Sequence, residues 1–222
     1  FERIAVNGAP DMILMDHPDK PDLSGVINGR SYRQIARITW TVTPFVAVAR
    51  ALKAHGFAGP DILAEDLDAG ILLMENLGSG KITDDAGAPV RARYIAAVEL
   101  LAHMHAKHIA RDLPIGNGQN FTLPPYGHDE LMIEARLMVE WYVPHRLGRT
   151  ATMEEEHAFV ALWGELITIL ERSETGLILR DYHSPYIVWR PEITGTDRLG
   201  LVDIQDALYG PLSYDVSSLA QD

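Results

Sequence analysis

The first 75 residues alternate short apolar runs with turn-forming residues, a pattern that favours strands. Residues 2–7 and 12–16 are β-branched or apolar, and the turn formers Asn7-Gly8 lie between them, which predicts a β-hairpin. Two more strands are expected at residues 62–66 and 71–75, on either side of a turn at 68–70. We therefore predict four short strands in this part of the chain.

One helix is expected among these strands. Residues 44–55 are mainly apolar, Thr43 suits the cap position, Pro44 suits the first helical turn, and Gly56 suits the exit from the helix. Residues 18–29 are interpreted as a loop, and residues 31–42 show no clean period. The order strand, strand, helix, strand, strand predicts a small α+β unit with an antiparallel sheet.

Residues beyond position 80 show helical spacing. Apolar residues on one face predict helices over 93–107 and 129–143, the second with Met138 and either Trp141 or Tyr142 turned inward. A third helix is expected over 153–171, opened by a capping box of Thr152 and Glu155. Residues 114–126, rich in Gly, Pro and Asn, are interpreted as a loop.

The last part of the chain returns to short apolar runs. They cover residues 177–179, 187–189 and 199–202, and a final helix is expected from Ser213. The texture changes at Gly78-Ser79-Gly80, which predicts a boundary between an N-terminal region, residues 1–78, and a C-terminal region, residues 79–222.

Composition narrows the function classes. The 19 Lys and Arg residues against 31 Asp and Glu residues give a net charge of −12, which argues against nucleic acid as a partner. The absence of cysteine excludes a disulfide scaffold, an iron–sulfur cluster and a thiolate zinc site. We find no apolar run of about 18 residues that could span a bilayer, and no export leader. A cytoplasmic protein without a membrane partner is expected.

Two motifs fail on inspection. Gly78-Ser79-Gly80-Lys81 suggests a phosphate-binding P-loop, but Glu75 and Ile82 occupy positions where that motif needs glycine and a hydroxyl residue. His103, His105 and His108 suggest a metal site. At about 100° per residue their side chains diverge around a helix, so they do not converge on one ion.

Two carboxylates stand out by their context. Asp181 lies in a polar segment between two apolar runs, and Asp203 directly follows the run at 199–202. Two neighbouring strand ends would present both at one cleft, where one carboxylate accepts a proton from a hydroxyl and the other holds Mg²⁺. The alternative is that both are turn residues, because Asp side chains bond to nearby backbone N–H groups.

At these residues the chain resembles a known family. The segments RDYHSP (180–185), LVDIQDA (201–207) and YDVSSL (214–219) are similar to the aminoglycoside phosphotransferase and choline kinase superfamily. MILMDHP (12–18), LLMENLG (72–78) and EWYV (140–143) are most similar to its bacterial amino-sugar kinases, which phosphorylate N-acetylmuramate and N-acetylglucosamine. The resemblance covers most of the chain in the correct order.

The resemblance implies a fold and roles for individual residues. It implies an α+β, two-lobed protein-kinase-like fold, with a small antiparallel-sheet lobe that is incomplete at its start and a larger, mainly helical lobe. Asp181 would be the catalytic base and Asp203 the Mg²⁺ ligand. Asp215 would hold the catalytic loop by accepting backbone N–H bonds, a structural role. The backbone of a hinge would contact the adenine of ATP; its residues would be Met74, Glu75, Asn76 and Leu77.

Three more residues are implied at the sugar pocket. The helix 129–143, with Glu134 and Trp141, would border the pocket, and His183 would lie beside it. For Glu134 and Trp141 the alternatives are an exposed helix charge and a core aromatic. For His183 the alternative is a loop residue bonded to backbone.

The chain also departs from the family pattern. The second metal ligand, normally Asn, is replaced by Tyr186, and the strand lysine that would hold the α- and β-phosphates is replaced by Met15. The nucleotide-covering loop would precede Phe1. The loss of one preorganised electrostatic partner often costs about 3 to 4 kcal/mol of transition-state stabilisation.

These observations lead to two functional hypotheses. The first is an ATP-dependent phosphotransferase, a small-molecule kinase that moves the γ-phosphate to a hydroxyl of an amino sugar and uses ATP and Mg²⁺. The second is a catalytically degenerate kinase-like protein that binds a nucleotide or a partner without transfer. The sequence gives neither the acceptor nor the oligomeric state.

Overall fold

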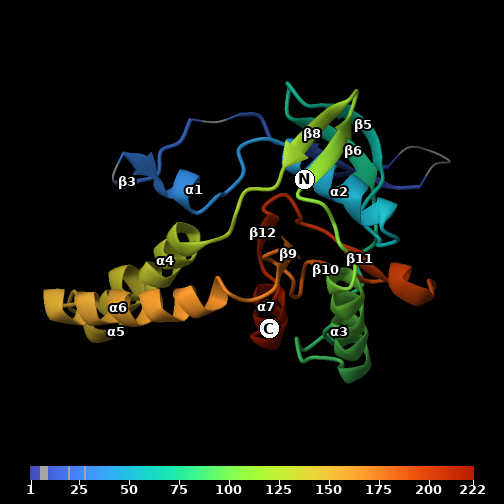
Figure 1. Ribbon diagram of the computed structural model, residues 1–222. Helices are drawn as coiled ribbons and strands as arrows, with labels where there is room; N and C mark the ends of the chain where they lie inside the picture. The colour runs from blue at the N-terminus through green and yellow to red at the C-terminus, as the bar shows by residue number, and fades with distance from the viewer. Residues whose placement is uncertain (6–9, 20, 28) are drawn as a thin grey trace.

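The computed structural model describes residues 1–5, 10–19, 21–27 and 29–222. Its largest sheet has four antiparallel strands in the order β1-β2-β6-β5, of which β5 and β6 are labelled in Figure 1. These strands are β1 Glu2–Ile4, β2 Met12–Asp16, β5 Ile62–Asp66 and β6 Ile71–Glu75. The four predicted strands are confirmed, whereas the predicted Asn7-Gly8 turn lies outside the described residues.

The helix expected next to the sheet is α2, Thr43–Ala54. Gly56, with a φ of 84°, turns the chain away from its end, as predicted. The predicted cap is wrong. Val42 occupies the N-cap position, Thr43 is the first helical residue, and no side chain makes a capping hydrogen bond. The helix begins one residue early because proline is tolerated throughout the first turn, where its missing N–H has no helical partner.

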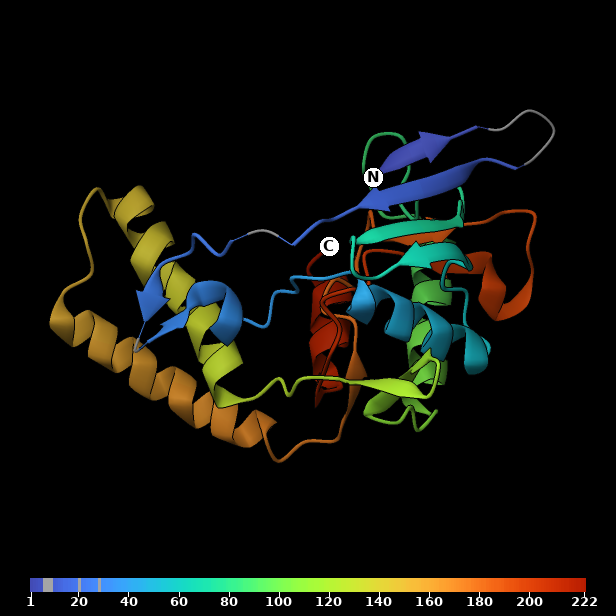
Figure 2. The same cartoon turned by 90° about the horizontal axis from the view of Figure 1, so that it is seen from above.

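The segment between β2 and α2 is more structured than expected. It contains the short strands β3 Val26–Ile27 and β4 Arg30–Ser31 and the helical turn α1 Tyr32–Ile35. Ser31 and Gln34 form a reciprocal capping box, which stabilises this single turn. Residues 18–29 were expected to form a loop, and this is corrected at Val26–Ile27, which form the strand β3. Figure 2 shows the segment lying beside α4, and Ile35 and Ala36 pack there on Ile133.

A second hairpin was also missed. β7 Asp112–Gly116 and β8 Gln119–Thr122 pair in the region interpreted as a loop. Asn117 and Gly118 have φ angles of 49° and 73°, and two consecutive positive φ values are characteristic of a type I′ hairpin turn. The Asn-Gly dipeptide was the available signal.

The remaining helices follow the predicted order. They are α3 Arg91–His105, α4 His128–Leu137, α5 Val143–Leu147, α6 Met153–Leu170 and α7 Ser213–Ala220. The predicted capping box of Thr152 and Glu155 opens α6, and α4 and α6 run side by side (Figure 2). Among the described residues, no helix is both long enough and apolar enough to cross a membrane.

The inward face predicted for the end of helix 129–143 is wrong. Residues Met138–Tyr142 form a π-helical turn, η1, between α4 and α5. Because a π turn holds one extra residue, it rotates the following side chains relative to the α-helical pattern. Val139 is buried, whereas Met138 and Trp141 are 51% and 72% exposed.

Two small antiparallel sheets position two loops next to each other. β9 Thr175–Ile178 pairs with β12 Leu208–Pro211, and β10 Ile187–Trp189 pairs with β11 Leu199–Leu201, which follows the 3₁₀ turn Gly195–Arg198. The loop between β9 and β10, residues 179–186, is therefore brought next to the loop between β11 and β12, residues 202–207. We call them the 179–186 loop and the 202–207 loop.

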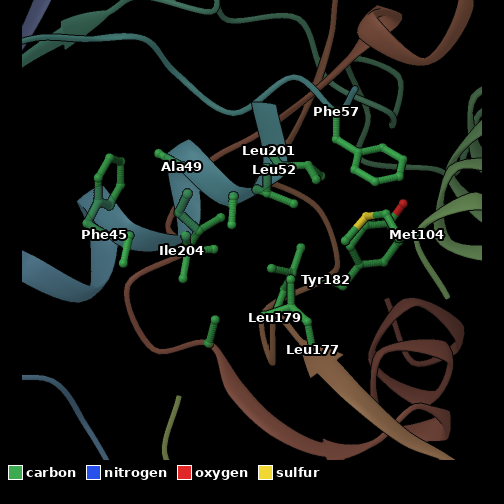
Figure 3. Packing of buried hydrophobic residues seen from close by; sticks show 14 of the residues in the cluster. Phe45, Ala49, Leu52, Phe57, Met104, Leu177, Leu179, Tyr182, Leu201 and Ile204 are labelled. Carbon is green, nitrogen blue, oxygen red and sulfur yellow. The ribbon is translucent and has the colours of Figure 1, made fainter. Parts of the chain in front are cut away.

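One hydrophobic core joins the large sheet to these loops. Phe45 and Leu52 of α2 pack in the same cluster as Leu179, Tyr182 and Ile204 (Figure 3). The expectation of a mixed fold with an antiparallel sheet and helices is confirmed. Because the core runs through both parts, the division at residue 78 stays a prediction.

Candidate active site

The 179–186 loop is anchored to α3 by a buried tyrosine. Tyr182 is 1% exposed, and its hydroxyl donates to the carbonyl oxygen of Ala97 in α3 at 2.7 Å. Burial raises the pKa of this phenol far above its usual range. The side chains on either side of Tyr182, Asp181 and His183, are consequently held at the surface of the loop.

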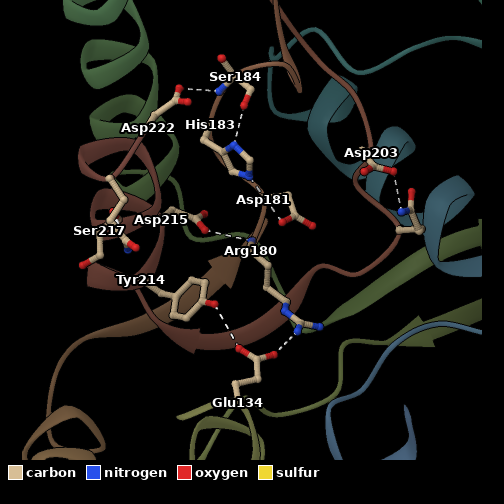
Figure 4. Close-up of polar contacts among 12 residues, drawn as sticks. Glu134, Arg180, Asp181, His183, Ser184, Asp203, Tyr214, Asp215, Ser217 and Asp222 are labelled. Atoms are coloured by element: carbon tan, nitrogen blue, oxygen red, sulfur yellow. Dashed lines mark hydrogen bonds and ion pairs between the residues drawn. The ribbon is translucent and has the colours of Figure 1, made fainter. Parts of the chain in front are cut away.

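The same loop is anchored from the side by Asp215 of α7, which is fully buried. Its two carboxylate oxygens accept the backbone N–H groups of Leu179 and Arg180 at 2.8 and 3.0 Å (Figure 4). Burial raises the pKa of Asp215 to about 7, although these two hydrogen bonds act in the opposite direction. Asp215 therefore contacts the loop backbone and lines neither of the cavities described below.

Asp181 follows a tight turn. Arg180 has a φ of 66°, and the Asp181 N–H donates to the carbonyl oxygen of Leu179 at 2.8 Å, an i to i−2 bond of the γ-turn kind. The Asp181 side chain is 41% exposed. Burial is the main cause that raises its pKa, Asp203 and Asp206 raise it further, and Arg180 and His183 lower it. This carboxylate is accessible to a ligand.

His183 lies beside Asp181. Its Nε2 is 3.7 Å from the nearer oxygen of Asp181, and its Nδ1 is 2.5 Å from the carbonyl oxygen of Ser184. When Nδ1 carries the proton it donates to that carbonyl, which leaves the Nε2 lone pair next to Asp181. Both readings of His183 are therefore compatible with its position, because one nitrogen bonds to backbone and the other faces the loop surface.

Asp203 occupies the start of the neighbouring loop. Its φ is 57°, a backbone conformation in which Asp is enriched among non-glycine residues, and Gln205 donates to its Oδ1 at 2.7 Å. The Val202 N–H donates to the carbonyl oxygen of Tyr186 at 3.1 Å and so joins the two loops. The pKa of Tyr186 is raised chiefly by Asp203, then by burial and by Asp181. The Tyr186 hydroxyl is therefore close enough to both carboxylates to be affected by their charges.

Two cavities adjoin the 179–186 loop. The first, of about 420 Å³, lies between β2, the segment 74–81 and the two loops, and it is lined by Asp203, Tyr186 and Pro185 together with apolar side chains. The second, of about 600 Å³, is lined by Asp181, His183 and Ser184. The 179–186 loop is therefore a wall shared by both cavities. The expected common cleft is not reproduced, because Asp203 lines the first cavity and Asp181 the second, but the two carboxylates lie on neighbouring loops (Figure 4), and Asp203 is close enough to raise the pKa of Asp181.

The predicted hinge residues line the first cavity. Met74, Glu75, Asn76 and Leu77 all belong to its wall. Gly80 is also there, and a Cβ atom on it would lie 2.1 Å from the carbonyl oxygen of Trp189. Met15 is 4% exposed in the core and does not belong to this wall, where β2 contributes Ile13 instead.

Glu134 and Trp141 line neither cavity. Glu134 is ion-paired to Arg180, and it accepts the hydroxyl groups of Tyr126 at 2.5 Å and Tyr214 at 3.3 Å. It is therefore not an exposed helix charge. Trp141 projects from η1 with 72% of its surface exposed, which rules out the core alternative.

Sequence reasoning missed part of the second cavity. The polar side chains that α7 and its end contribute to the wall are Tyr214, Ser217, Ser218 and Gln221. Their spacing of three to four residues places Tyr214, Ser217 or Ser218, and Gln221 on one helical face. That spacing was a readable signal, because an isolated polar face on a predicted helix points to a surface or a site.

Comparison with known proteins decides the family. The model of the phosphotransferase enzyme family, APH, matches residues 33–222, which is well over half of the chain. The chain belongs to this family. The resemblance to this family found in the sequence is thereby confirmed.

Curated relatives of the chain carry one name, "N-acetylmuramate/N-acetylglucosamine kinase". The Caulobacter vibrioides protein is 30% identical over 236 residues, covering all of this chain and 63% of the relative. The Pseudomonas putida protein is 31% identical and the Pseudomonas aeruginosa protein 32% identical, each covering 81% of this chain and 49% of the relative. The chain thus spans between 49% and 63% of the length of these relatives.

The family association raises the question of a metal. In the described residues, no group of three or more His, Cys, Asp or Glu side chains is placed to hold an ion. Mg²⁺ in nucleotide sites needs only one or two carboxylates, because phosphate oxygens and water complete its shell. Asp203, facing the first cavity, fits that requirement, whereas the phenol of Tyr186 beside it is a weak ligand for a hard cation.

Proposed function

We propose that this protein transfers the γ-phosphate of ATP to a hydroxyl group of a small molecule, an amino sugar. The carrying observation is the pair of joined loops, 179–186 and 202–207, which present the Asp181 and Asp203 carboxylates close to each other, each in the wall of a cavity that the 179–186 loop also lines. The first cavity has apolar walls suited to a purine, and the second has the hydroxyl, amide and carboxylate groups that bind sugars. The names of the curated relatives support the amino sugar as acceptor.

The side chains would act as follows. The wall formed by residues 74–77 would hold adenine, with Ile13 and Val188 against its faces. Asp203 would hold Mg²⁺, which when bound neutralises phosphate oxygens of the nucleotide. Asp181 would accept the proton of the acceptor hydroxyl as its oxygen bonds to the γ-phosphorus and the bond to the bridging oxygen of ADP breaks.

The acceptor would lie on α7. Ser217 donates its hydroxyl to the carbonyl oxygen of Ser213 at 3.0 Å, so its oxygen lone pairs are free to accept from a sugar hydroxyl. Gln221 offers an amide, and His183 lies between this face and Asp181. Trp141 as a sugar contact stays a prediction.

The test is phosphate transfer by the purified chain. Incubation with Mg-ATP and a panel of N-acetylglucosamine, N-acetylmuramate, aminoglycosides and choline-like alcohols should give a phosphorylated amino sugar, detected by mass spectrometry. Asp181→Asn should lower kcat by about 10² to 10⁴, the usual contribution of a general base. Asp68→Asn, an exposed turn residue, is the matched control and should leave kcat unchanged. Transfer that persists in Asp181→Asn would exclude Asp181 as the base.

A second candidate function rests on Tyr186. Its phenol occupies the place of the second metal ligand beside Asp203, which favours a protein that binds a nucleotide without transferring phosphate. Calorimetry with ATP, with and without Mg²⁺, separates the two. Metal-independent binding without turnover supports this second candidate, and transfer activity gained by Tyr186→Asn would support it further.

A further inference from the structure

A carboxylate on α4 contacts the 179–186 loop from outside both cavities. The Glu134 side chain is 23% exposed and binds three donors from three separate segments. Figure 4 shows its contacts with Arg180 and Tyr214. They are the guanidinium of Arg180, the hydroxyl of Tyr126 before α4, and the hydroxyl of Tyr214 on α7. Such a set of contacts satisfies the carboxylate internally, so little of its hydrogen-bonding capacity is left for a ligand.

Its main partner directly precedes the proposed base. The Arg180 side chain is 12% exposed, its guanidinium donates to the carbonyl oxygen of Ala36 at 3.1 Å, and it lies 5.4 Å from the ring centre of Tyr126. A buried guanidinium without a carboxylate is costly. Among the described residues, Glu134 is the carboxylate that forms an ion pair with it.

The backbone of Arg180 also needs support. Its φ of 66° lies in the left-handed region, which a non-glycine residue occupies at a cost that surrounding contacts must meet. Asp215 holds the backbone N–H of Arg180, while Glu134 and Ala36 hold its side chain. The direction in which Asp181 points therefore depends on a turn that is fixed at both ends.

We propose that Glu134 is a positioning residue that clamps Arg180 and thereby fixes the turn that directs Asp181 toward the acceptor. This proposal rests on the proposed phosphotransfer function and replaces the direct sugar contact expected for Glu134. In this arrangement a displacement of α4 would move the 179–186 loop and so Asp181, without any contact between Glu134 and the ligand.

The test is a double-mutant cycle on kinetic constants. Glu134→Gln keeps the shape of the side chain and an acceptor for the tyrosine hydroxyls but removes the charge that binds Arg180. It should lower kcat by about 10- to 100-fold, the effect expected when a reacting group is misplaced by up to about 1 Å. The acceptor KM and the Kd for ATP should change less than about twofold.

The second arm of the cycle is Arg180→Gln. If Glu134 acts through Arg180, the double variant should have the same kcat as Arg180→Gln within about twofold. The effects of the two substitutions would then not add, because both remove the same interaction. Glu140→Gln is the control, since Glu140 follows on the same helical stretch and, among the residues that the structure describes, forms its ion pair with Arg136, at 2.9 Å, and not with Arg180. It should leave kcat unchanged.

Three results would overturn the clamp. One is a raised acceptor KM with unchanged kcat in Glu134→Gln, which identifies a sugar ligand. Another is additive loss in the double variant. The third concerns the fraction of Glu134→Gln molecules that bind ATP in calorimetry. If kcat divided by this fraction equals the wild-type kcat, the residue has a purely structural role.

A wild-type chain without transfer overturns the proposed function but still leaves the clamp testable. Hydrogen exchange at the Asp181 amide then decides, because that N–H closes the turn with Leu179. The clamp predicts faster exchange in Glu134→Gln than in Glu140→Gln. Equal exchange rates in the two variants overturn it.

Discussion

The two cavities beside the 179–186 loop differ in the material of their walls. The first is lined largely by aliphatic side chains, such as Ile13, Val188 and Val202, and by the backbone of a glycine-containing segment. The second is lined largely by polar groups, such as Asp181, His183 and Ser217. The first wall would suit a flat apolar ring, as proposed for the nucleotide base, and the second would suit a molecule with many hydroxyl groups, as proposed for the acceptor.

This difference indicates where specificity resides. An apolar slot closed by backbone accommodates a nucleotide base with few side-chain requirements, so substitutions there act mainly through shape. On the proposed acceptor side, binding would depend on individual donors and acceptors from α7, so each substitution there would remove a defined hydrogen bond. The wall between them belongs to both sides, and changes in it should affect both ligands.

The largest effect is expected from the residue that holds this shared wall. Asp215→Ala leaves the buried N–H groups of Leu179 and Arg180 without acceptors, which should lower the free energy of unfolding by about 3 kcal/mol. Both ATP and the acceptor should bind more weakly. Urea unfolding measures the loss of stability. Asp112→Ala, an exposed carboxylate on β7, is the control, and an equal loss in both variants would contradict the anchoring role.

A substitution on the nucleotide side should act through shape. In Gly80→Ala the new Cβ would approach the Trp189 carbonyl oxygen to 2.1 Å, so the backbone of this segment must shift. We expect a Kd for ATP raised about tenfold, equivalent to about 1.4 kcal/mol, with the acceptor KM unchanged. Calorimetry measures the first and steady-state kinetics the second. Gly164→Ala, at an open position on α6, should change neither.

A substitution on the acceptor side should remove one hydrogen bond. Ser217→Ala should raise the acceptor KM by about 3- to 10-fold, the effect of one neutral hydrogen bond, and leave the Kd for ATP unchanged. Ser173→Ala is a close control, because Ser173 also donates to a helix carbonyl, that of Leu170 at 2.6 Å, but lies outside both cavities. A KM change of equal size in both variants would contradict the placement of the acceptor on α7.

Local patterns predicted the elements well but their exceptions poorly. The strands at 62–66 and 71–75 and the capping box of α6 follow from side-chain periodicity and capping chemistry, which are local properties. The β7–β8 hairpin was missed because its Gly, Pro and Asn residues favoured the interpretation of this segment as a loop. The π turn at Met138–Tyr142 was missed because one extra residue in a turn leaves no mark in apolar spacing.

The site was predicted in part for the same reason. Asp181 and Asp203 could be placed at neighbouring strand ends, since both follow short apolar runs. The role of Glu134 could not be read from the sequence, because its ion pair with Arg180 joins positions 46 residues apart through the packing of α4. Long-range pairs of this kind depend on how elements pack, which no local pattern specifies.

The smallest effect concerns the charge around the shared wall. The pKa of Asp181 is raised by burial first, and among its neighbours Asp206 is a lesser contributor in the same direction. A base must be ionised, so a raised pKa moves the acid limb of kcat upward in pH, and removal of a like charge moves it back. Asp206→Asn should therefore shift the acid limb of the kcat profile to lower pH while leaving the plateau unchanged.

This variant is a clean one because the structure around it is kept. The side-chain oxygen of Asn can still accept the Thr39 N–H, which donates to Asp206 at 2.7 Å. Asp197→Asn, an exposed carboxylate in the 3₁₀ turn, is the control and should leave the limb in place. A limb that moves upward in Asp206→Asn would mean that a group other than the Asp181 carboxylate limits the rate at low pH, because that carboxylate gains acidity when a neighbouring negative charge is removed.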